Sequence, residues 1–165
     1  EVHVEDIKSG HDLYDHLFDI GGKFNIKPGA PNHAERIEGG LLSYGNDMLI
    51  SDNPFECGFE KSVHLNTEID FIGKENLKII KNKGISRNLM GVKIDTDQIN
   101  YTDVNLLNKE NKIIGDLRSA AFSPELKKIV GIAMVEKDFC NNNKNFIINI
   151  NNKIVTGEIC NFPIK

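Results

Sequence analysis

The stretch RIEGGLLSYGNDM, residues 36–48, decides the fold of this chain. Just ahead of it, Asn32 and Glu35 stand at the spacing of a capping box, in which each side chain accepts a hydrogen bond from the other's backbone amide. The helix that begins there would end at Gly39-Gly40, because glycine readily adopts the backbone that closes a helix. Gly45-Asn46-Asp47 then predicts a turn. We interpret the stretch as structural, a capped helix that runs into a loop, and expect it to contact no substrate.

The segment upstream of this stretch predicts a strand followed by an amphipathic helix. Val2 to Glu5 alternates between apolar and polar residues like a short strand, and Ser9 is a suitable N-cap for the helix after it. Gly21-Gly22 would stop that helix. Its apolar positions recur at helical spacing: Leu13, Leu17 and Ile20. Because the chain begins at Glu1 without a methionine and inside the expected strand, we expect it to be part of a longer protein.

Downstream, the pattern changes from helical to strand-like. Leu77 and Ile80 share one side of a short helix that Gly84 would cap. Five short apolar or alternating runs follow, separated by turn-forming residues: 89–94, 112–122, 129–135, 146–150 and 154–159. Asn151-Asn152 fits a two-residue hairpin between the last two runs, because asparagine tolerates positive φ. Regularly spaced strands predict a small barrel or sandwich, with a domain boundary near Lys83.

Composition places the chain among folded proteins and excludes some classes of partner. The 165 residues are 39% hydrophobic and 27% charged, enough for one ordinary domain or two small ones. The formal net charge is −4 and the pI about 5.7. An acidic protein without a dense basic patch is a poor match to nucleic acid or an anionic membrane. The lysines of 74–83 follow a helix-like pattern, which indicates a solvated helix face.

The cysteines and histidines predict neither disulfides nor metal sites. Three isolated cysteines, with no Cys-x-x-Cys pair, are typical of reduced core residues in a cytoplasmic protein. No run reaches the length of a membrane span. The five histidines lack metal-ligand spacing, and no Gly-x-Ser-x-Gly elbow, P-loop or Gly-x-Gly-x-x-Gly is present. We therefore predict no metal ligand and no catalytic residue within these residues.

Several motifs in a fixed order resemble one family. They are residues 36–48, then NPFECG at 53–58, FIGKE at 71–75, SPEL at 123–126 and IAMV at 132–135. This order resembles the C-terminal half of the aminomethyltransferase family, which includes the glycine cleavage T-protein and folate-dependent dimethylsulfoniopropionate demethylases. The resemblance covers essentially the whole chain. It implies an α+β fold, in which residues 1–82 are the end of an α/β (ferredoxin-like) folate-binding domain plus a connecting helix. Residues 83–165 would be a C-terminal antiparallel β-barrel.

The resemblance also implies a tetrahydrofolate site and names candidate residues for it. Glu1 matches a glutamate that holds the pterin, since one carboxylate accepts two parallel N–H donors; a frayed, solvated terminal glutamate is the alternative. His3, on the same face of the expected strand, would lie near the substrate, where the resemblance implies an aromatic residue such as tyrosine in the demethylases for cation–π attraction. Histidine departs from that pattern and counts against the demethylase branch, because a neutral imidazole can stack but a protonated one would repel a cation. Asn32 falls where the T-proteins have a folate-contacting arginine. An asparagine lacks the forked cationic donor, and this favours the demethylase branch.

Three functions follow from the resemblance. The first is a methyltransferase that moves a methyl group from dimethylsulfoniopropionate or a similar onium compound to tetrahydrofolate. The second is a T-protein-like aminomethyltransferase that uses a lipoylated carrier protein. The third is a folate-binding protein without turnover. The expected partners are a small-molecule methyl donor and the N-terminal half of the same protein, with a homodimer as a further alternative. Catalytic residues would lie in that N-terminal half, so these residues alone would be inactive.

Overall fold

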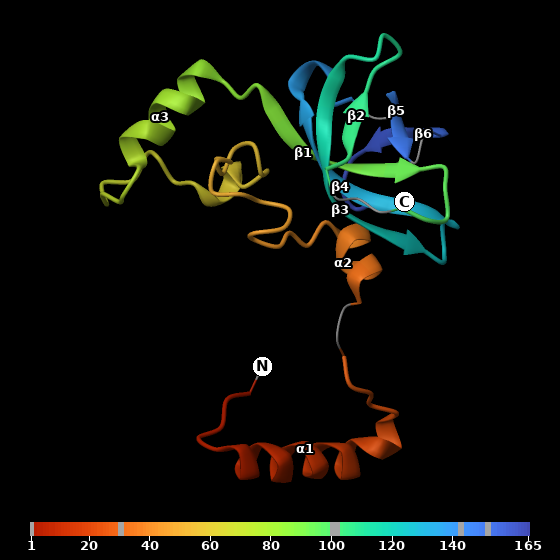
Figure 1. Ribbon diagram of the computed structural model, residues 1–165. Helices are drawn as coiled ribbons and strands as arrows, with labels where there is room; N and C mark the ends of the chain where they lie inside the picture. Colours follow the sequence, from red (N-terminus) through yellow and green to blue (C-terminus); the bar gives the residue numbers. More distant parts are fainter. Residues whose placement is uncertain (1, 30–31, 100–102, 142–143, 151–152) are drawn as a thin grey trace. The chain divides into compact units, whose positions relative to one another are not determined.

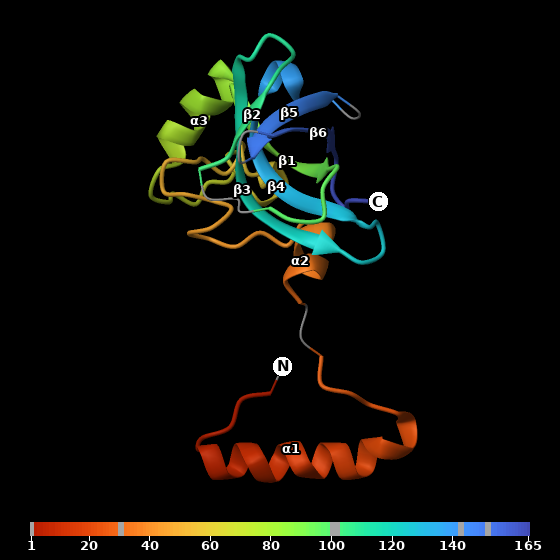
Figure 2. The ribbon, with the colours of Figure 1, turned by 45° about the vertical axis from the view of Figure 1, so that its right-hand side comes forward.

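The chain divides into two compact units, Glu1–Pro31 and Asn32–Lys165, in a computed structural model that describes residues 2–29, 32–99, 103–141, 144–150 and 153–165. The first unit holds a helix and a short 3-10 turn; the second holds two helices and a barrel (Figures 1 and 2). The helical elements are α1 (Ile7–Gly21), η1 (Gly22–Phe24), α2 (His33–Gly39), η2 (Glu60–Ser62), α3 (Lys74–Lys83) and η3 (Lys137–Phe139). The strands are β1 (Arg87–Ile94), β2 (Asn105–Leu107), β3 (Ile113–Ser123), β4 (Lys128–Glu136), β5 (Asn145–Ile150) and β6 (Lys153–Cys160).

The start of the chain departs from its prediction in two ways. Val2, His3 and Val4 are exposed and form no strand, because no strand of the described residues pairs with them. The N-cap of helix α1 lies three residues earlier than the expected cap, Ser9. The Asp6 carboxylate accepts hydrogen bonds from both the backbone amide (2.9 Å) and the hydroxyl (2.7 Å) of Ser9, so Asp6 is the N-cap. The same bonds lower the pKa of Asp6.

The two helices of the second unit begin and end as predicted. Asn32 Oδ1 accepts from the Glu35 amide (2.9 Å), and Glu35 Oε2 accepts from the Asn32 amide (3.3 Å), which completes the capping box of α2. Gly40 closes α2 with φ 71°, in the left-handed region. Gly84 caps α3, and its amide donates to the carbonyl of Ile80. A side-chain capping box and a glycine therefore define the ends of α2, and a glycine defines the end of α3.

The six strands form a closed antiparallel barrel in the order β1-β4-β3-β2-β5-β6, which confirms the predicted barrel. Pairing between β1 and β6 closes the barrel: Gly91 lies opposite Cys160 at one end of this pairing, and Ile94 lies opposite Gly157 at the other. The five predicted runs correspond to β1, β3, β4, β5 and β6; β2 is too short to show a period and was not predicted. Asn151-Asn152, the expected hairpin, lies outside the described residues. The expected ferredoxin-like sheet is not among the described residues before β1 and stays a prediction, as does the boundary near Lys83.

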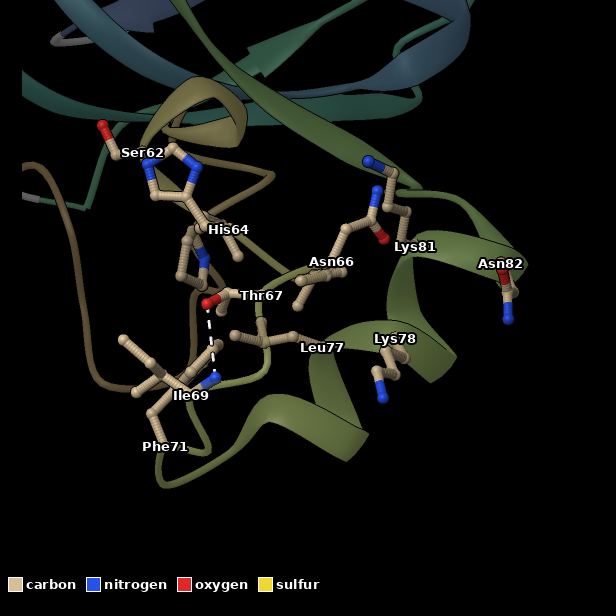
Figure 3. Close-up of a pocket in the computed structure, with 13 residues that line it drawn as sticks. Ser62, His64, Asn66, Thr67, Ile69, Phe71, Leu77, Lys78, Lys81 and Asn82 are labelled. Carbon is tan, nitrogen blue, oxygen red and sulfur yellow. Dashed lines mark hydrogen bonds between the residues drawn. The ribbon is translucent and has the colours of Figure 1, made fainter.

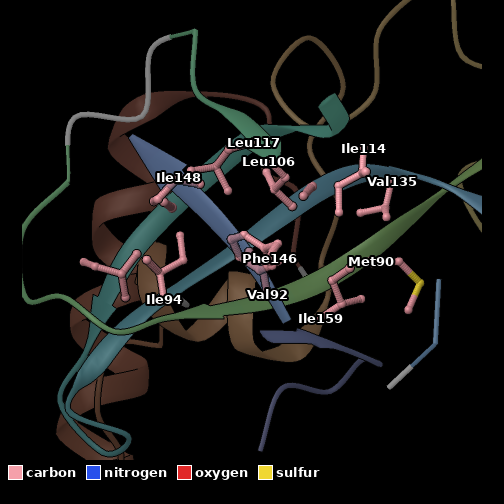
Figure 4. Packing of buried hydrophobic residues seen from close by; sticks show 13 residues of the cluster. Met90, Val92, Ile94, Leu106, Ile114, Leu117, Val135, Phe146, Ile148 and Ile159 are labelled. Atoms are coloured by element: carbon pink, nitrogen blue, oxygen red, sulfur yellow. The ribbon is translucent and has the colours of Figure 1, made fainter. Parts of the chain in front are cut away.

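Side chains of the strands fill two apolar clusters on opposite faces of the barrel wall. In β4, Ile129, Ala133 and Val135 belong to the interior cluster, and Val130, Ile132 and Met134 to the outer one. This alternation follows from the two-residue period of a strand. The interior cluster, which includes Phe146 and Ile148, fills the barrel (Figure 4). Ile37 of α2 is fully buried in the outer cluster, so the predicted helix packs on the barrel wall.

All three cysteines are free thiols, as predicted. Burial raises the pKa of Cys57 and of Cys160 to about 11, and burial also raises the pKa of Cys140. These groups therefore remain protonated at neutral pH and act as apolar core groups rather than nucleophiles.

Candidate functional site

The stretch at 36–48 is held against the barrel by one buried carboxylate. Asp47 is fully buried and accepts from Arg36 Nη1 (2.8 Å), from the Ser43 amide (2.6 Å) and from the hydroxyl of Ser119 on β3. Arg36 Nη2 in turn donates to Ser119 Oγ (3.1 Å), and Nη1 also donates to the Leu41 carbonyl (3.1 Å). Both carboxylate oxygens of Asp47 and both terminal nitrogens of Arg36 therefore have hydrogen-bond partners within the protein. The role of this ionic cluster is structural, in line with the interpretation of the stretch from sequence.

A second ionic cluster joins the loop after this stretch to the barrel. Arg87 Nε donates to Glu56 Oε1 (3.0 Å), and Arg87 Nη2 donates to Asp52 Oδ1 (2.9 Å). The Asp52 side chain is fully buried and that of Glu56 is 8% exposed. The hydrogen bond that Arg87 donates to Glu56 raises the pKa of Arg87. The loop is thus fixed to β1 by charge-assisted bonds, which are stronger than neutral ones.

Arg118 completes this cluster but keeps part of its hydrogen-bonding capacity unused. Its side chain is 8% exposed, its Nη2 lies 3.7 Å from Asp52 Oδ1, and its Nε is paired with the Asp116 carboxylate. Its Nη1 is buried and has no hydrogen-bond partner in the described part of the chain. Sequence reasoning missed this residue. The available signal was a pair of charged residues, Asp116 and Arg118, inside an otherwise apolar and small-residue run, GDLRSAAF at 115–122.

A cavity with a volume of about 1230 Å³ lies between the 62–71 segment and α3 (Figure 3). Lys74 holds its wall: the buried ammonium donates to the carbonyls of Thr67 (2.6 Å) and Ile69 (3.0 Å). Apolar side chains of Phe71 and Leu77 line it, together with His64. Among the described residues that line it there is no carboxylate. This cavity therefore does not supply the acidic group expected to hold a pterin.

The described structure does not test whether the predicted folate and substrate residues share one site. Glu1 lies outside the described residues, and exposed His3 is on no strand. Asn32 uses Oδ1 as the helix cap, which leaves its Nδ2 group as the side-chain donor available to a ligand. The assignments of Glu1, His3 and Asn32 to a folate site stay predictions.

The Asn32→Asp variant separates the two roles of this residue. Aspartate caps a helix as well as asparagine does but lacks the amide donor. We expect the free energy of unfolding to change by less than about 0.5 kcal/mol, because the cap is kept. Tetrahydrofolate binding to the complete protein would weaken if Nδ2 donates to the ligand, by about 1 kcal/mol. Chemical denaturation and calorimetric titration measure the two quantities. Unchanged folate affinity would remove Asn32 from the site.

The described residues contain neither a cluster of metal-ligating side chains nor a membrane-spanning helix. No three of their His, Cys, Asp and Glu side chains are placed to share a metal ion. None of their helices combines the length and apolar character that crossing a bilayer requires.

Comparison with known proteins agrees with the architecture. Residues 87–164 match the glycine cleavage T-protein C-terminal barrel domain. The chain is 36% identical over 137 residues to the dimethylsulfoniopropionate demethylase DmdA of Ruegeria pomeroyi, a match that covers 83% of this chain and 37% of that protein. It is 39% identical over 128 residues to an aminomethyltransferase of Thermosipho melanesiensis, covering 78% of this chain and 34% of the relative.

A solved structure shares the fold. The glycine cleavage system aminomethyltransferase T from Bartonella henselae matches with a TM-score of 0.73 and 23% identity, over 79% of this chain and 37% of that one. The chain thus spans little more than a third of the length of the relatives it matches. The identities to the demethylase and to the aminomethyltransferase are too similar to choose between them. Through the C-terminal barrel domain that residues 87–164 form, the chain belongs to the glycine cleavage T-protein family.

Proposed function

We propose that the protein containing this chain is a tetrahydrofolate-dependent one-carbon transferase that demethylates dimethylsulfoniopropionate or a similar methylated onium compound. Family membership supports the transferase class. The observation that carries the finer proposal is Asn32, whose oxygen is committed to the α2 cap. A residue with one remaining amide donor cannot replace the forked cation that the resemblance places here in T-proteins.

We place most of the tetrahydrofolate site outside the described residues. Asn32 offers one donor, and the large cavity beside α3 offers no carboxylate among its described lining residues. We therefore assign to these residues a supporting role: the barrel and its ionic clusters hold the loop after α2 in one conformation. The proposal places the methyl donor, the catalytic groups and most folate contacts in the rest of the protein, and leaves a homodimer as an alternative assembly.

The second candidate is an aminomethyltransferase of the T-protein type, because the 39% identity to the Thermosipho melanesiensis aminomethyltransferase is comparable to the 36% identity to the demethylase. It would release ammonia from an aminomethylated lipoyl carrier and form methylene-tetrahydrofolate. The third candidate binds folate without turnover.

Turnover assays with the complete protein and tetrahydrofolate separate the three. Methyl-tetrahydrofolate formed from dimethylsulfoniopropionate supports the demethylase. Ammonia released from a loaded lipoyl carrier, without methyl transfer from the sulfonium compound, would replace it with the aminomethyltransferase. Folate binding with neither product would leave the non-catalytic candidate. Residues 1–165 alone are expected to give no turnover in either assay.

Glu1→Gln is expected to weaken tetrahydrofolate binding to the complete protein by roughly 1–3 kcal/mol, because a charge-assisted pair with the pterin is lost. Glu68→Gln is the matched control, since Glu68 is exposed and carries the same substitution. Titration calorimetry gives both dissociation constants. Equal values for wild type and Glu1→Gln would remove Glu1 from the folate site.

A further inference from the structure

The cavity between the 62–71 segment and α3 has a wall that is fixed by hydrogen bonds. The buried ammonium of Lys74 donates to two backbone carbonyls of this segment, those of Thr67 (2.6 Å) and Ile69 (3.0 Å). The Ile69 amide also donates to Thr67 Oγ1 (3.2 Å), the dashed bond in Figure 3. Lys74 does not line the cavity, so its part is to shape the wall. The cavity is therefore preformed, as small-molecule sites usually are, and its volume of about 1230 Å³ admits a small organic molecule.

Aliphatic side chains form one part of the cavity lining. Val63 and Leu65 come from the segment and Leu77 comes from α3, and all three are half-buried. Ile69 adds further aliphatic surface, and Phe71 is the one phenyl ring among the described lining residues. A ligand body that covers these side chains leaves water, which is favourable for any apolar group. The composition of this part of the lining therefore favours an aliphatic body over an aromatic one.

The charged part of the lining is cationic among the residues that the structure describes. Lys78 and Lys81 line the cavity, and no Asp or Glu of those residues does. Together with Leu77 they lie on one side of α3, because residues three and four apart share a helix face (Figure 3). Their acidic partners, Glu75 (2.7 Å from Lys78) and Glu60 (3.4 Å from Lys81), lie outside the lining in exposed pairs. Such pairs contribute little to stability, so an anionic ligand can replace either carboxylate.

These two parts of the lining limit the class of ligand. A small anion without an apolar body leaves the aliphatic side chains in water, and an apolar cation is repelled by the two ammonium groups. We propose that this cavity binds a medium-chain carboxylate. Its chain lies along Val63, Leu65 and Leu77, and its carboxylate accepts from Lys78 and Lys81. Because the described lining has no carboxylate to hold a pterin, this site is separate from the folate site and independent of the one-carbon transfer proposed above.

The test is calorimetric titration of the complete protein with three probes: octanoate, butyrate and octylammonium. Butyrate keeps the carboxylate but shortens the chain, and octylammonium keeps the chain but reverses the charge. We expect octanoate to bind at least about tenfold more tightly than either of the others. Equal affinity for butyrate would mean that exposed lysines bind any anion, and equal affinity for octylammonium would mean an apolar surface without charge selection. Either result, or no binding of octanoate at millimolar concentrations, overturns the proposal.

A second titration, with tetrahydrofolate already bound, separates this site from the folate site. Unchanged octanoate affinity is expected, because the two ligands occupy different places. Competition between octanoate and tetrahydrofolate would make the cavity part of the folate site and overturn the proposal. A protein that binds octanoate but shows no one-carbon transfer would overturn the proposed function and leave this site in place.

Charge variants assign the carboxylate to the two lysines. Lys78→Gln and Lys81→Gln are each expected to weaken octanoate binding by about fivefold, since each removes one exposed charge, without weakening octylammonium binding. Lys83→Gln is the matched control, because Lys83 is exposed on the same helix but does not line the cavity. If octanoate affinity is the same in all three variants, the lysines of the cavity do not hold the carboxylate.

A polar substitution tests the place of the chain. Leu77→Asn is expected to weaken octanoate binding by at least about tenfold, because the apolar contact with the chain is lost. Ile79→Asn is its control: Ile79 is exposed on α3 and does not line the cavity, so affinity is expected to persist. Equal affinities in the two variants contradict the proposed placement. If Leu77→Asn does not fold, the lysine variants still decide, because both lysine side chains are about half exposed.

Discussion

Asp47→Ala is expected to lower the free energy of unfolding by roughly 3–5 kcal/mol, the range for removing one partner of a buried ion pair. The fully buried carboxylate is the common acceptor for Arg36, the Ser43 amide and Ser119. Its loss leaves the guanidinium, which is 17% exposed, without its counter-charge and leaves two further donors unpaired. The effect is large because the Asp47 carboxylate alone connects α2, the loop that follows it and β3.

Urea denaturation followed by circular dichroism measures this change. Asp47→Asn keeps the size and one acceptor oxygen, so a smaller loss of about 1–3 kcal/mol is expected. Glu60→Gln is the control for removing an acidic residue, since its 3.4 Å pair with Lys81 is exposed; it is expected to cost less than about 1 kcal/mol. If Asp47→Ala lowers the free energy of unfolding by no more than Glu60→Gln does, Asp47 does not hold residues 36–48 against the barrel.

The features that sequence predicted correctly are those whose causes are local. The capping box of Asn32 and Glu35 depends on two residues three positions apart, and the Gly40 and Gly84 caps depend on one residue each. The barrel strands were predictable because alternation and turn residues recur along the chain. Val2 to Glu5 shows the limit of this reasoning: alternation describes a strand, but pairing requires a neighbour that the pattern does not supply.

The ionic clusters could not be predicted because their members are distant in sequence. Asp47 and Ser119 are 72 residues apart, and Glu56 and Arg87 are 31 apart. Their contacts depend on strand register, which a one-residue shift would change. The position of Arg118 is the hardest to predict, because it depends on a β-bulge and no turn-forming residue in the sequence marks that bulge. Among the site residues, only the capping role of Asn32 was visible in local spacing.

The neighbouring glycines of the motif, Gly39 and Gly40, are expected to respond in opposite ways to alanine. Gly40 has φ 71°, and a Cβ there would lie 2.7 Å from Phe162 Cγ and 2.8 Å from Phe162 Cβ. Because the clash includes the first atom of the Phe162 side chain, a rotamer change cannot relieve it. The left-handed backbone costs an alanine roughly 1–2 kcal/mol, and overpacking adds about 1–3 kcal/mol.

We therefore expect Gly40→Ala to lower the free energy of unfolding by roughly 2–5 kcal/mol. At Gly39, the nearest atom to an added Cβ is Leu41 Cγ at 3.9 Å, an ordinary contact. Gly39→Ala is then expected to be neutral or to stabilise by up to about 1 kcal/mol, because alanine favours the helix. Parallel urea denaturation of the two variants measures the difference. Equal stabilities would mean that Gly40 is not required for its backbone conformation and that Phe162 does not pack against the end of α2. A difference of the expected sign would show that the fold requires glycine only at the second of the two positions, Gly40.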